Sequence, residues 1–363
     1  MTFSPPNRAA AAPRFSALAT VLRRDQPNRV GTPEEVVARA QRAERDGFDV
    51  ICLADLGYAE IFPAVTLVAL RTEQIAISTR VIGVFTRSPV LFASGAAWAN
   101  RISGGRFSLG IGASLPAIVE GVHGGRWANP VGRMIDTLKL YRALYGEEVA
   151  GVRRNPDGSV AYEGETLRVE RALLDLAAPR PPIIVAASAP RMLQVAGAWG
   201  DGAIIEYTSP GYIRWAWEQI AIGAQTTGRS LAAFDLCAET TFHTEVDDPA
   251  LTARQESWLT ALINHCLLPR FDHLWRPAGL LEAARAVRAA ALRGDRAEAR
   301  RLALAEIVPH IAVSGPRERA PAAFQHWLGE RRALGVTTFA LPLELEDFVG
   351  VTVPEARALA TAG

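Results

Sequence analysis

Two carboxylates stand directly after apolar segments of the sequence, where a buried strand would end. Asp55 follows the segment 50–54, and Glu206 follows the segment 203–205. A carboxylate in such a place can hydrogen-bond a ligand or exchange a proton with it. We expect Glu206 to contact a ligand and to take part in its chemistry. For Asp55 two interpretations stay open, a ligand contact and a cap for the turn that follows.

A serine lies where another apolar segment meets a segment of helical pattern. Residues 187–191 read Ala187, Ser188, Ala189, Pro190 and Arg191. The hydroxyl of Ser188 and the free amides at a helix start suit a phosphate group. An ordinary serine N-cap would give the same sequence. Its place at the end of a strand favours the phosphate.

The best candidate for an acid or base among the histidines is His123. It lies in a glycine-rich loop that also contains Glu120, and we count both as candidate catalytic residues. Histidine exchanges protons near neutral pH, and the glycines allow the loop to move and to fit closely. A histidine that only pins the loop would give the same sequence, so both interpretations stay open.

Small residues mark a third candidate site, at Gly112, Ala113 and Ser114. Gly110 and Gly112 resemble the start of a dinucleotide-binding motif, but the third glycine is missing. The motif also requires a place after the first strand, whereas this segment follows the fourth apolar strand. The better interpretation is that small residues let a flat ring approach the backbone.

Several kinds of chemistry are not expected, because the residues that they need are missing or lie in the wrong place. Its single lysine, Lys139, lies in an amphipathic segment and not at a strand end, so imine chemistry is not expected. No HExxH or other clustered metal spacing occurs among the six histidines, so we expect no metal site. No Gly-x-Ser-x-Gly motif occurs either, which argues against a serine triad.

Charge and cysteine content indicate a cytoplasmic protein. The net charge of +1 gives no attraction to nucleic acid or to an anionic membrane. The three cysteines form no CxxC pair, which fits a reducing compartment. No apolar run is long enough for a membrane span, and the N-terminus lacks a signal peptide pattern.

Strand and helix patterns alternate along the chain and must position these residues. A helix start is clear at Thr32, Pro33 and Glu35, which form a capping box with proline at the first helical position. Alternating strands and helices build a parallel sheet. Eight strands predict a closed (β/α)8 TIM barrel, with chemistry at the carboxyl ends of its strands. The predicted strands are 15–22, 49–55, 75–84, 106–113, 183–187, 203–206, 236–242 and 337–341.

Two insertions interrupt the alternation. Residues 151–180 contain a strong turn at 154–158 and predict a hairpin. Residues 247–309 are rich in alanine and arginine and too long for one barrel helix, so we expect a helical excursion. We therefore expect a flexible lead-in over 1–14 and a single barrel domain over 15–363.

Several short motifs follow one another along the chain, at 86–89 (TRSP), 102–112 (ISGGRFSLGIG), 119–124 (VEGVHG), 129–134 (NPVGRM), 181–188 (PPIIVAAS) and 198–202 (AWGDG). In their order and spacing they resemble the luciferase-like monooxygenase superfamily, in its branch of coenzyme-F420-dependent oxidoreductases. The resemblance covers about 43–207 and resumes at 313–315 and 333–343. The loop with Glu120 and His123, and Arg87 two residues before a proline, resemble the F420 branch more than FMN enzymes.

The resemblance implies that a deazaflavin binds at the strand ends. It also implies a non-proline cis peptide at the end of the third strand, at Arg80–Val81, whose bulge backs the ring. The positions that the resemblance and the strand-end rule together assign to the cofactor are Asp55, Arg80, Val81, Ile82, Thr86, Arg87, Gly112, Ala113, Ser114, Ala187, Ser188, Ala189, Arg191 and Glu206. Arg87 and Arg191 are the candidates for the acidic tail of F420.

Two departures limit what the resemblance implies about substrate. The sugar-phosphate dehydrogenases of this branch carry histidine where this chain has Leu56, and glutamate in the loop that here reads Ala113 to Pro116. That substrate is therefore not expected. We expect hydride transfer between F420 and a small-molecule or peptide-borne substrate, with reduction of a C=C, C=N or C=O bond favoured. An FMN-dependent monooxygenase and a non-catalytic flavin-binding homologue are the alternatives, and a homodimer is left open.

Overall fold

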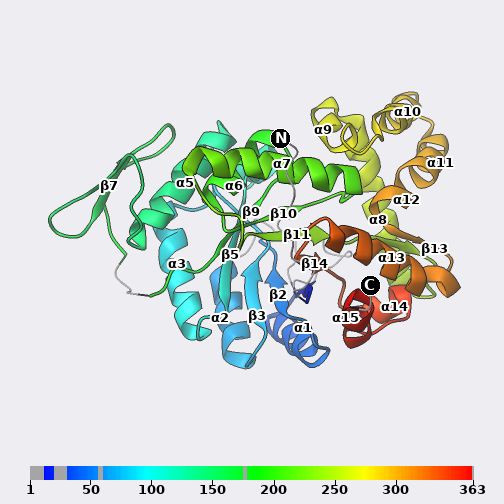
Figure 1. Ribbon diagram of the computed structural model, residues 1–363, viewed down its shortest axis with the longest axis horizontal. Helices are drawn as coiled ribbons and strands as arrows, with labels where there is room; N and C mark the ends of the chain where they lie inside the picture. Colours follow the sequence, from blue (N-terminus) through cyan, green and yellow to red (C-terminus); the bar gives the residue numbers. More distant parts are fainter. Residues whose placement is uncertain (1–11, 20–30, 56–59, 175–177, 362–363) are drawn as a thin grey trace.

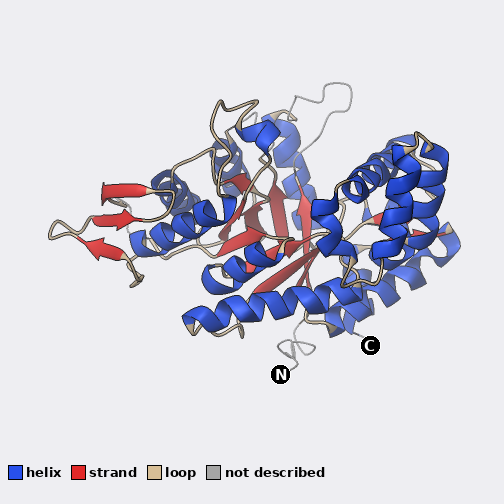
Figure 2. Ribbon diagram, turned by 90° about the horizontal axis from the view of Figure 1, so that it is seen from above, coloured by secondary structure: helices blue, strands red, loops and turns tan. Residues whose placement is uncertain are grey.

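Eight parallel strands close into a barrel in the computed structural model, which describes residues 12–19, 31–55, 60–174 and 178–361. The ring closes because β3 pairs with β5 at one side and β1 pairs with β14 at the other. Helices surround the strands in both views (Figures 1 and 2). The predicted (β/α)8 barrel is confirmed. Its strands are β1 (Arg14–Leu18), β2 (Val50–Leu53), β3 (Ala76–Thr79), β5 (Phe107–Gly112), β9 (Ile183–Ala186), β10 (Gly202–Ile205), β11 (Asp235–Glu239) and β14 (Thr338–Ala340).

The surrounding helices begin at residues that the sequence marks clearly. Thr32 accepts a hydrogen bond from the Glu35 amide, and Glu35 accepts one from the Thr32 amide, so the capping box is present. Ser88 and Ser209 cap two further helices that also begin with proline. The helices that alternate with the strands are α1 (Pro33–Arg45), α2 (Ile61–Arg71), α3 (Pro89–Ile102), α5 (Pro130–Leu144), α6 (Pro190–Trp199), α7 (Pro210–Thr227) and α13 (Ala320–Ala333).

The third strand is not continuous over 75–84 as the sequence predicts. It stops at Thr79 and resumes as β4 (Ile82–Gly83), which pairs with β5. The peptide bond between Arg80 and Val81 is cis, at the place that the resemblance implies. A Cβ at Gly110 would lie 1.9 Å from the Thr79 carbonyl oxygen, and one at Gly112 would lie 2.7 Å from Val81. These glycines therefore admit the bend of the neighbouring strand, and the approach of a flat ring to the backbone here stays a prediction.

Both insertions lie outside the barrel (Figure 1). The first is a three-stranded antiparallel sheet and not a simple hairpin, of β6 (Val152–Arg154), β7 (Val160–Glu163) and β8 (Arg168–Ala172). The second follows β12 (Phe242–Thr244) and returns at β13 (Val313–Gly315), which pairs with β12. Its helices are α8 (Pro249–Leu267), α9 (Asp272–Trp275), α10 (Leu281–Leu292), α11 (Arg296–Glu306) and α12 (Val308–Ile311).

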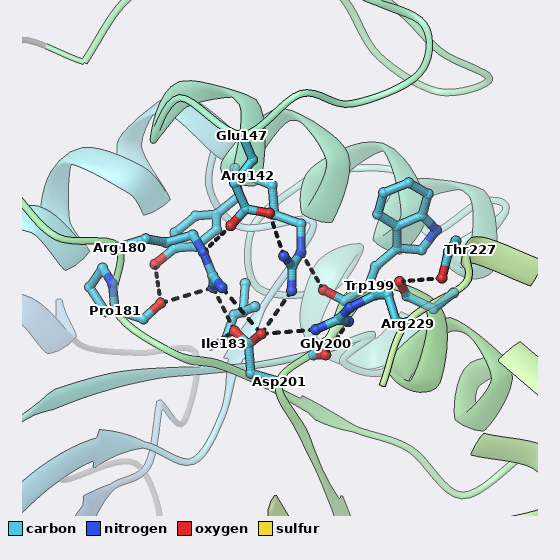
Figure 3. A network of polar contacts seen from close by, with 12 residues as sticks. Arg142, Glu147, Arg180, Pro181, Ile183, Trp199, Gly200, Asp201, Thr227 and Arg229 are labelled. Carbon is cyan, nitrogen blue, oxygen red and sulfur yellow. Dashed lines mark hydrogen bonds and ion pairs between the residues drawn. The ribbon is translucent and has the colours of Figure 1, made fainter. Parts of the chain in front are cut away.

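A network of charged side chains ties elements together at the amino-terminal end of the barrel (Figure 3). Asp201, directly before β10, accepts hydrogen bonds from Arg142 at 2.8 Å, Arg180 at 2.5 Å and Arg229 at 3.1 Å. It also accepts the Ile183 amide at the start of β9, at 2.9 Å. Although burial alone would raise the pKa of Asp201, Arg180 and the other donors hold it below its ordinary value. Residues at this end of a barrel stabilise the fold rather than react.

Among the described helices, none has the length and apolar character that a membrane crossing requires.

Candidate active site

A cavity of about 250 Å³ opens at the carboxyl ends of the barrel strands. This is the end at which barrels of this type carry their chemistry. Nearly every strand contributes to its wall, and the wall mixes apolar and charged side chains. The residues that represent the strands are Leu18, Ala54, Arg80, Ala186, Glu206, Glu239 and Ala340.

The side chain of Arg80 points into the barrel beneath this cavity. Its Nη1 lies 3.6 Å from the Cys237 sulfur, and its Nη2 lies 3.8 Å from a Glu239 carboxylate oxygen. The side chain is only 12% exposed. Nη2 is buried and has no hydrogen-bond partner within the described part of the chain. Buried charged donors are normally hydrogen-bonded, and a contact of Arg80 with a cofactor stays a prediction.

Glu206 lies at the end of β10 and faces the same cavity. Its carboxylate is open to the cavity but otherwise surrounded by protein. This poor solvation, together with the negative charge of Glu239, raises the pKa of Glu206 to about 7, although Arg80 opposes the rise. A carboxyl group with a pKa near neutrality is suited to give or take a proton. The raised pKa is thus a physical reason for the prediction that Glu206 takes part in the chemistry of a ligand.

The residue after Glu206 fixes the chain at this point. Tyr207 has a left-handed backbone with φ of 52°, which is rare for a residue of its size. Its hydroxyl lies 2.9 Å from Nδ1 of His265, and its ring contacts Trp275. Both partners come from the second insertion, which therefore holds the end of β10 in place.

The turn between β9 and α6 has the features of an anion site. The N-cap of α6 is Ala189, which offers no side-chain cap, so the alternative in which Ser188 is an ordinary N-cap is wrong. The Ser188 carbonyl accepts a hydrogen bond from Tyr212 at 2.9 Å, which anchors the turn. Ala187 is buried and Arg191 is exposed. The uncapped helix start leaves backbone amides for a phosphate.

Other predicted cofactor residues make contacts within the protein. The Thr86 hydroxyl donates to the Gly83 carbonyl at 2.9 Å. Arg87 forms an ion pair with Glu60 and lies over the ring of Phe62. Ile82 is fully buried in the core, so only its backbone remains for a ligand. These assignments stay predictions.

The loop after β5 surrounds the predicted positions Gly112 to Ser114. Ser114 has a left-handed φ of 59°, and the Ala113 carbonyl accepts the Trp127 indole N–H at 3.0 Å. A Glu120 carboxylate oxygen accepts the Trp127 amide at 3.0 Å. His123 and Glu120 are both exposed, and neither is among the described residues that line the cavity. The structure therefore does not bring them together with Glu206, and their catalytic role stays a prediction.

Asp55 is half-buried next to the cavity residue Ala54. The sequence difference at Leu56 lies outside the described residues. No group of metal-ligating side chains occurs in the described ranges.

Several residues of this cavity were not predicted from the sequence, among them Glu239, Thr240 and Arg254. Glu239 stood inside the predicted strand 236–242, whereas β11 ends at Glu239. The strand-end rule would have found it if the end of the strand had been placed correctly. Arg254 lies on α8, in an insertion with no recognisable motif.

Comparison with known proteins gives matches over most of the chain. Residues 14–338 match the family described as luciferase-like monooxygenase. The chain is 32% identical over 206 residues to a 5,10-methylenetetrahydromethanopterin reductase of Archaeoglobus fulgidus, covering 56% of this chain and 59% of that protein. It is 30% identical over 189 residues to an F420-dependent glucose-6-phosphate dehydrogenase of Intrasporangium calvum, covering 47% and 53%. The chain thus spans less than two thirds of these relatives.

A solved structure supports the fold over nearly the whole chain. The coenzyme F420 dependent tetrahydromethanopterin reductase from Methanopyrus kandleri superposes with a TM-score of 0.70 at 20% sequence identity. The superposition covers 95% of this chain and 99% of the other.

Proposed function

The chain belongs to the luciferase-like monooxygenase family, and from this premise we propose that it is an oxidoreductase that uses coenzyme F420. The observation that carries the proposal is the cavity at the strand ends, in which Glu206 can hold a proton beside the buried cation Arg80. The choice of coenzyme is supported by the relatives, whose names include an F420-dependent dehydrogenase.

The residues at the strand ends fit a coenzyme with a flat ring and a phosphate. The uncapped start of α6 with Ser188 would hold the phosphate, and Arg191 lies beyond it for the acidic tail. The bend at Val81 lies on the cavity wall, where it would back the ring. Bound there, F420 would supply or accept a hydride, because carbon replaces the central nitrogen of a flavin and disfavours oxygen activation.

The chain's own part in a reduction is to supply the proton. Addition of a hydride to one atom of a C=C, C=N or C=O bond leaves the other atom in need of a proton. Glu206 would donate it and become a carboxylate, and the positive charge of Arg80 would stabilise that carboxylate. Arg80 would also stabilise negative charge that develops on the substrate, since a fixed cation in a poorly solvated site acts strongly.

Titration of the purified protein with F420 and with FMN tests the proposal. We expect F420 to bind with a micromolar or lower Kd and FMN at least about tenfold more weakly, or about 1.4 kcal/mol. Tight FMN binding with oxygen-dependent turnover would assign the protein to the monooxygenases instead. Failure to bind either coenzyme would favour a non-catalytic homologue. A cytoplasmic location, a small-molecule or peptide-borne substrate and a homodimer stay predictions.

A further inference from the structure

A second cavity of about 170 Å³ adjoins the first at the barrel mouth. The two share Glu239, Thr240, Arg254 and Pro342 in their walls. The second cavity extends toward α8 and is otherwise lined mainly by aromatic side chains, namely Phe242, Trp258 and Phe348. A molecule whose reacting bond lies beside Glu206 could therefore extend into this second space.

The charges around the second cavity leave an excess of positive charge at Arg254. Its guanidinium lies 3.2 Å from Glu344, and Arg39 lies 3.2 Å from the same carboxylate. Two arginines thus share one carboxylate. The acidic side chain among the described residues of the wall, Glu239, has its own cation in Arg80 at 3.8 Å. The side chain of Arg254 is 49% exposed, so it has donors available to a ligand.

Thr240 supplies an independent sign that a ligand binds here. It is only 8% exposed, lies on the wall of both cavities, and its hydroxyl has no hydrogen-bond partner within the described ranges. A buried hydroxyl without a partner is unfavourable and rare in native structures. By contrast, the neighbouring Gln255 donates to the Thr244 carbonyl at 2.9 Å and is already satisfied. The unused hydroxyl of Thr240 is therefore available to a bound molecule.

We propose that the second cavity binds a planar, apolar part of the substrate that carries a single carboxylate, with Arg254 and Thr240 as the donors and Trp258 as a packing surface. A carboxylate matches the planar fork of a guanidinium. The inference rests on the proposed function, because it assumes that the reacting bond lies in the first cavity.

Binding of small aromatic probes tests this substrate class without knowledge of the substrate. Benzoate and 2-naphthoate are compared with their neutral carboxamides by ligand-observed NMR and calorimetry at millimolar concentrations. We expect the carboxylates to bind at least fivefold more tightly than the carboxamides. Arg254→Gln should weaken carboxylate binding about tenfold and leave carboxamide binding unchanged. Thr240→Val should weaken carboxylate binding several-fold without lowering Tm.

The matched control is Arg285→Gln on α10, since Arg285 is also half-exposed and paired with a glutamate but lies away from both cavities. It should bind every probe as the wild type does. Equal affinity for carboxylates and carboxamides, no binding of either, or an unaffected Arg254→Gln variant would overturn the inference. F420 is titrated into the wild type and into Arg285→Gln, and it should bind both alike. Carboxylate selectivity without F420 binding in the wild type would overturn the proposed function and leave the subsite standing.

Discussion

Replacement of Glu206 by glutamine should change how the stability of the protein depends on pH. In the folded protein the pKa of Glu206 is raised from 4.5 to about 7, mainly by poor solvation and also by Glu239. The protonated form is therefore favoured on folding. This contribution to stability is complete below about pH 4.5 and is lost as pH rises through about 7. The glutamine variant carries no such titration.

The size of the effect follows from the same values. A rise from 4.5 to about 7 corresponds to about 3.4 kcal/mol at about 1.36 kcal/mol per pKa unit. Because Glu206 is open to the cavity, water screens it and reduces the expected value to about 1 to 2 kcal/mol. Between pH 5 and pH 8 the wild type should therefore lose about 1 to 2 kcal/mol more stability than Glu206→Gln.

Urea denaturation of both proteins at pH 5 and pH 8 measures this difference. The free energy of unfolding is taken at each pH, and the two differences are compared. Carboxyl-carbon NMR of labelled protein then assigns the titration to Glu206. Identical pH dependence in the two proteins, or a Glu206 resonance that titrates near pH 4.5, would refute the reasoning.

Three further predictions follow from other parts of the structure. Ser188→Asp should abolish F420 binding through charge repulsion at the start of α6 while Tm stays unchanged, and unchanged affinity would remove Ser188 from the coenzyme site. Asp201→Asn should lower the free energy of unfolding by about 2 to 4 kcal/mol at pH 7, because it leaves three arginines around a neutral group. The pKa of Asp201 is lowered in the folded state from its ordinary value of 3.8. The stability that Asp201 contributes is therefore present above pH 3.8 and is lost as pH falls through the lower folded pKa. The same loss of stability at acid pH in Asp201→Asn would contradict this. Gly110→Ala should prevent folding or lower Tm strongly, because the new Cβ would meet the Thr79 carbonyl. The control Gly329→Ala, in the open middle of α13, should be neutral or stabilising. Equal Tm values for the two variants would show that the close packing of β3 on β5 is not required.

The barrel could be predicted because its signals are local. Apolar runs such as Val50 to Leu53 mark strands covered on both faces, and caps such as Thr32 and Ser88 mark where helices begin. The bend at the end of β3 has no local signal of its own, because it depends on the glycines of the next strand, Gly110 and Gly112. Only the resemblance to a family placed it.

The site could be predicted only in part, because several of its contacts join distant residues. Glu206 was found from its place at a strand end. The pairing of Arg87 with Glu60 and the position of Arg254 on the wall of the cavity depend on how the segments pack. Glu239 was missed because the predicted strand ran on to Phe242, which belongs to β12 and pairs with β13 outside the barrel.

The coenzyme that the protein retains from a host that makes both F420 and FMN tests the central claim most directly. The protein is purified without added coenzyme, and the bound molecule is identified by its absorption spectrum and mass. We expect F420 in the wild type and its loss in Ser188→Asp. FMN in the wild type, or retention of F420 by a correctly folded Ser188→Asp variant, would contradict it.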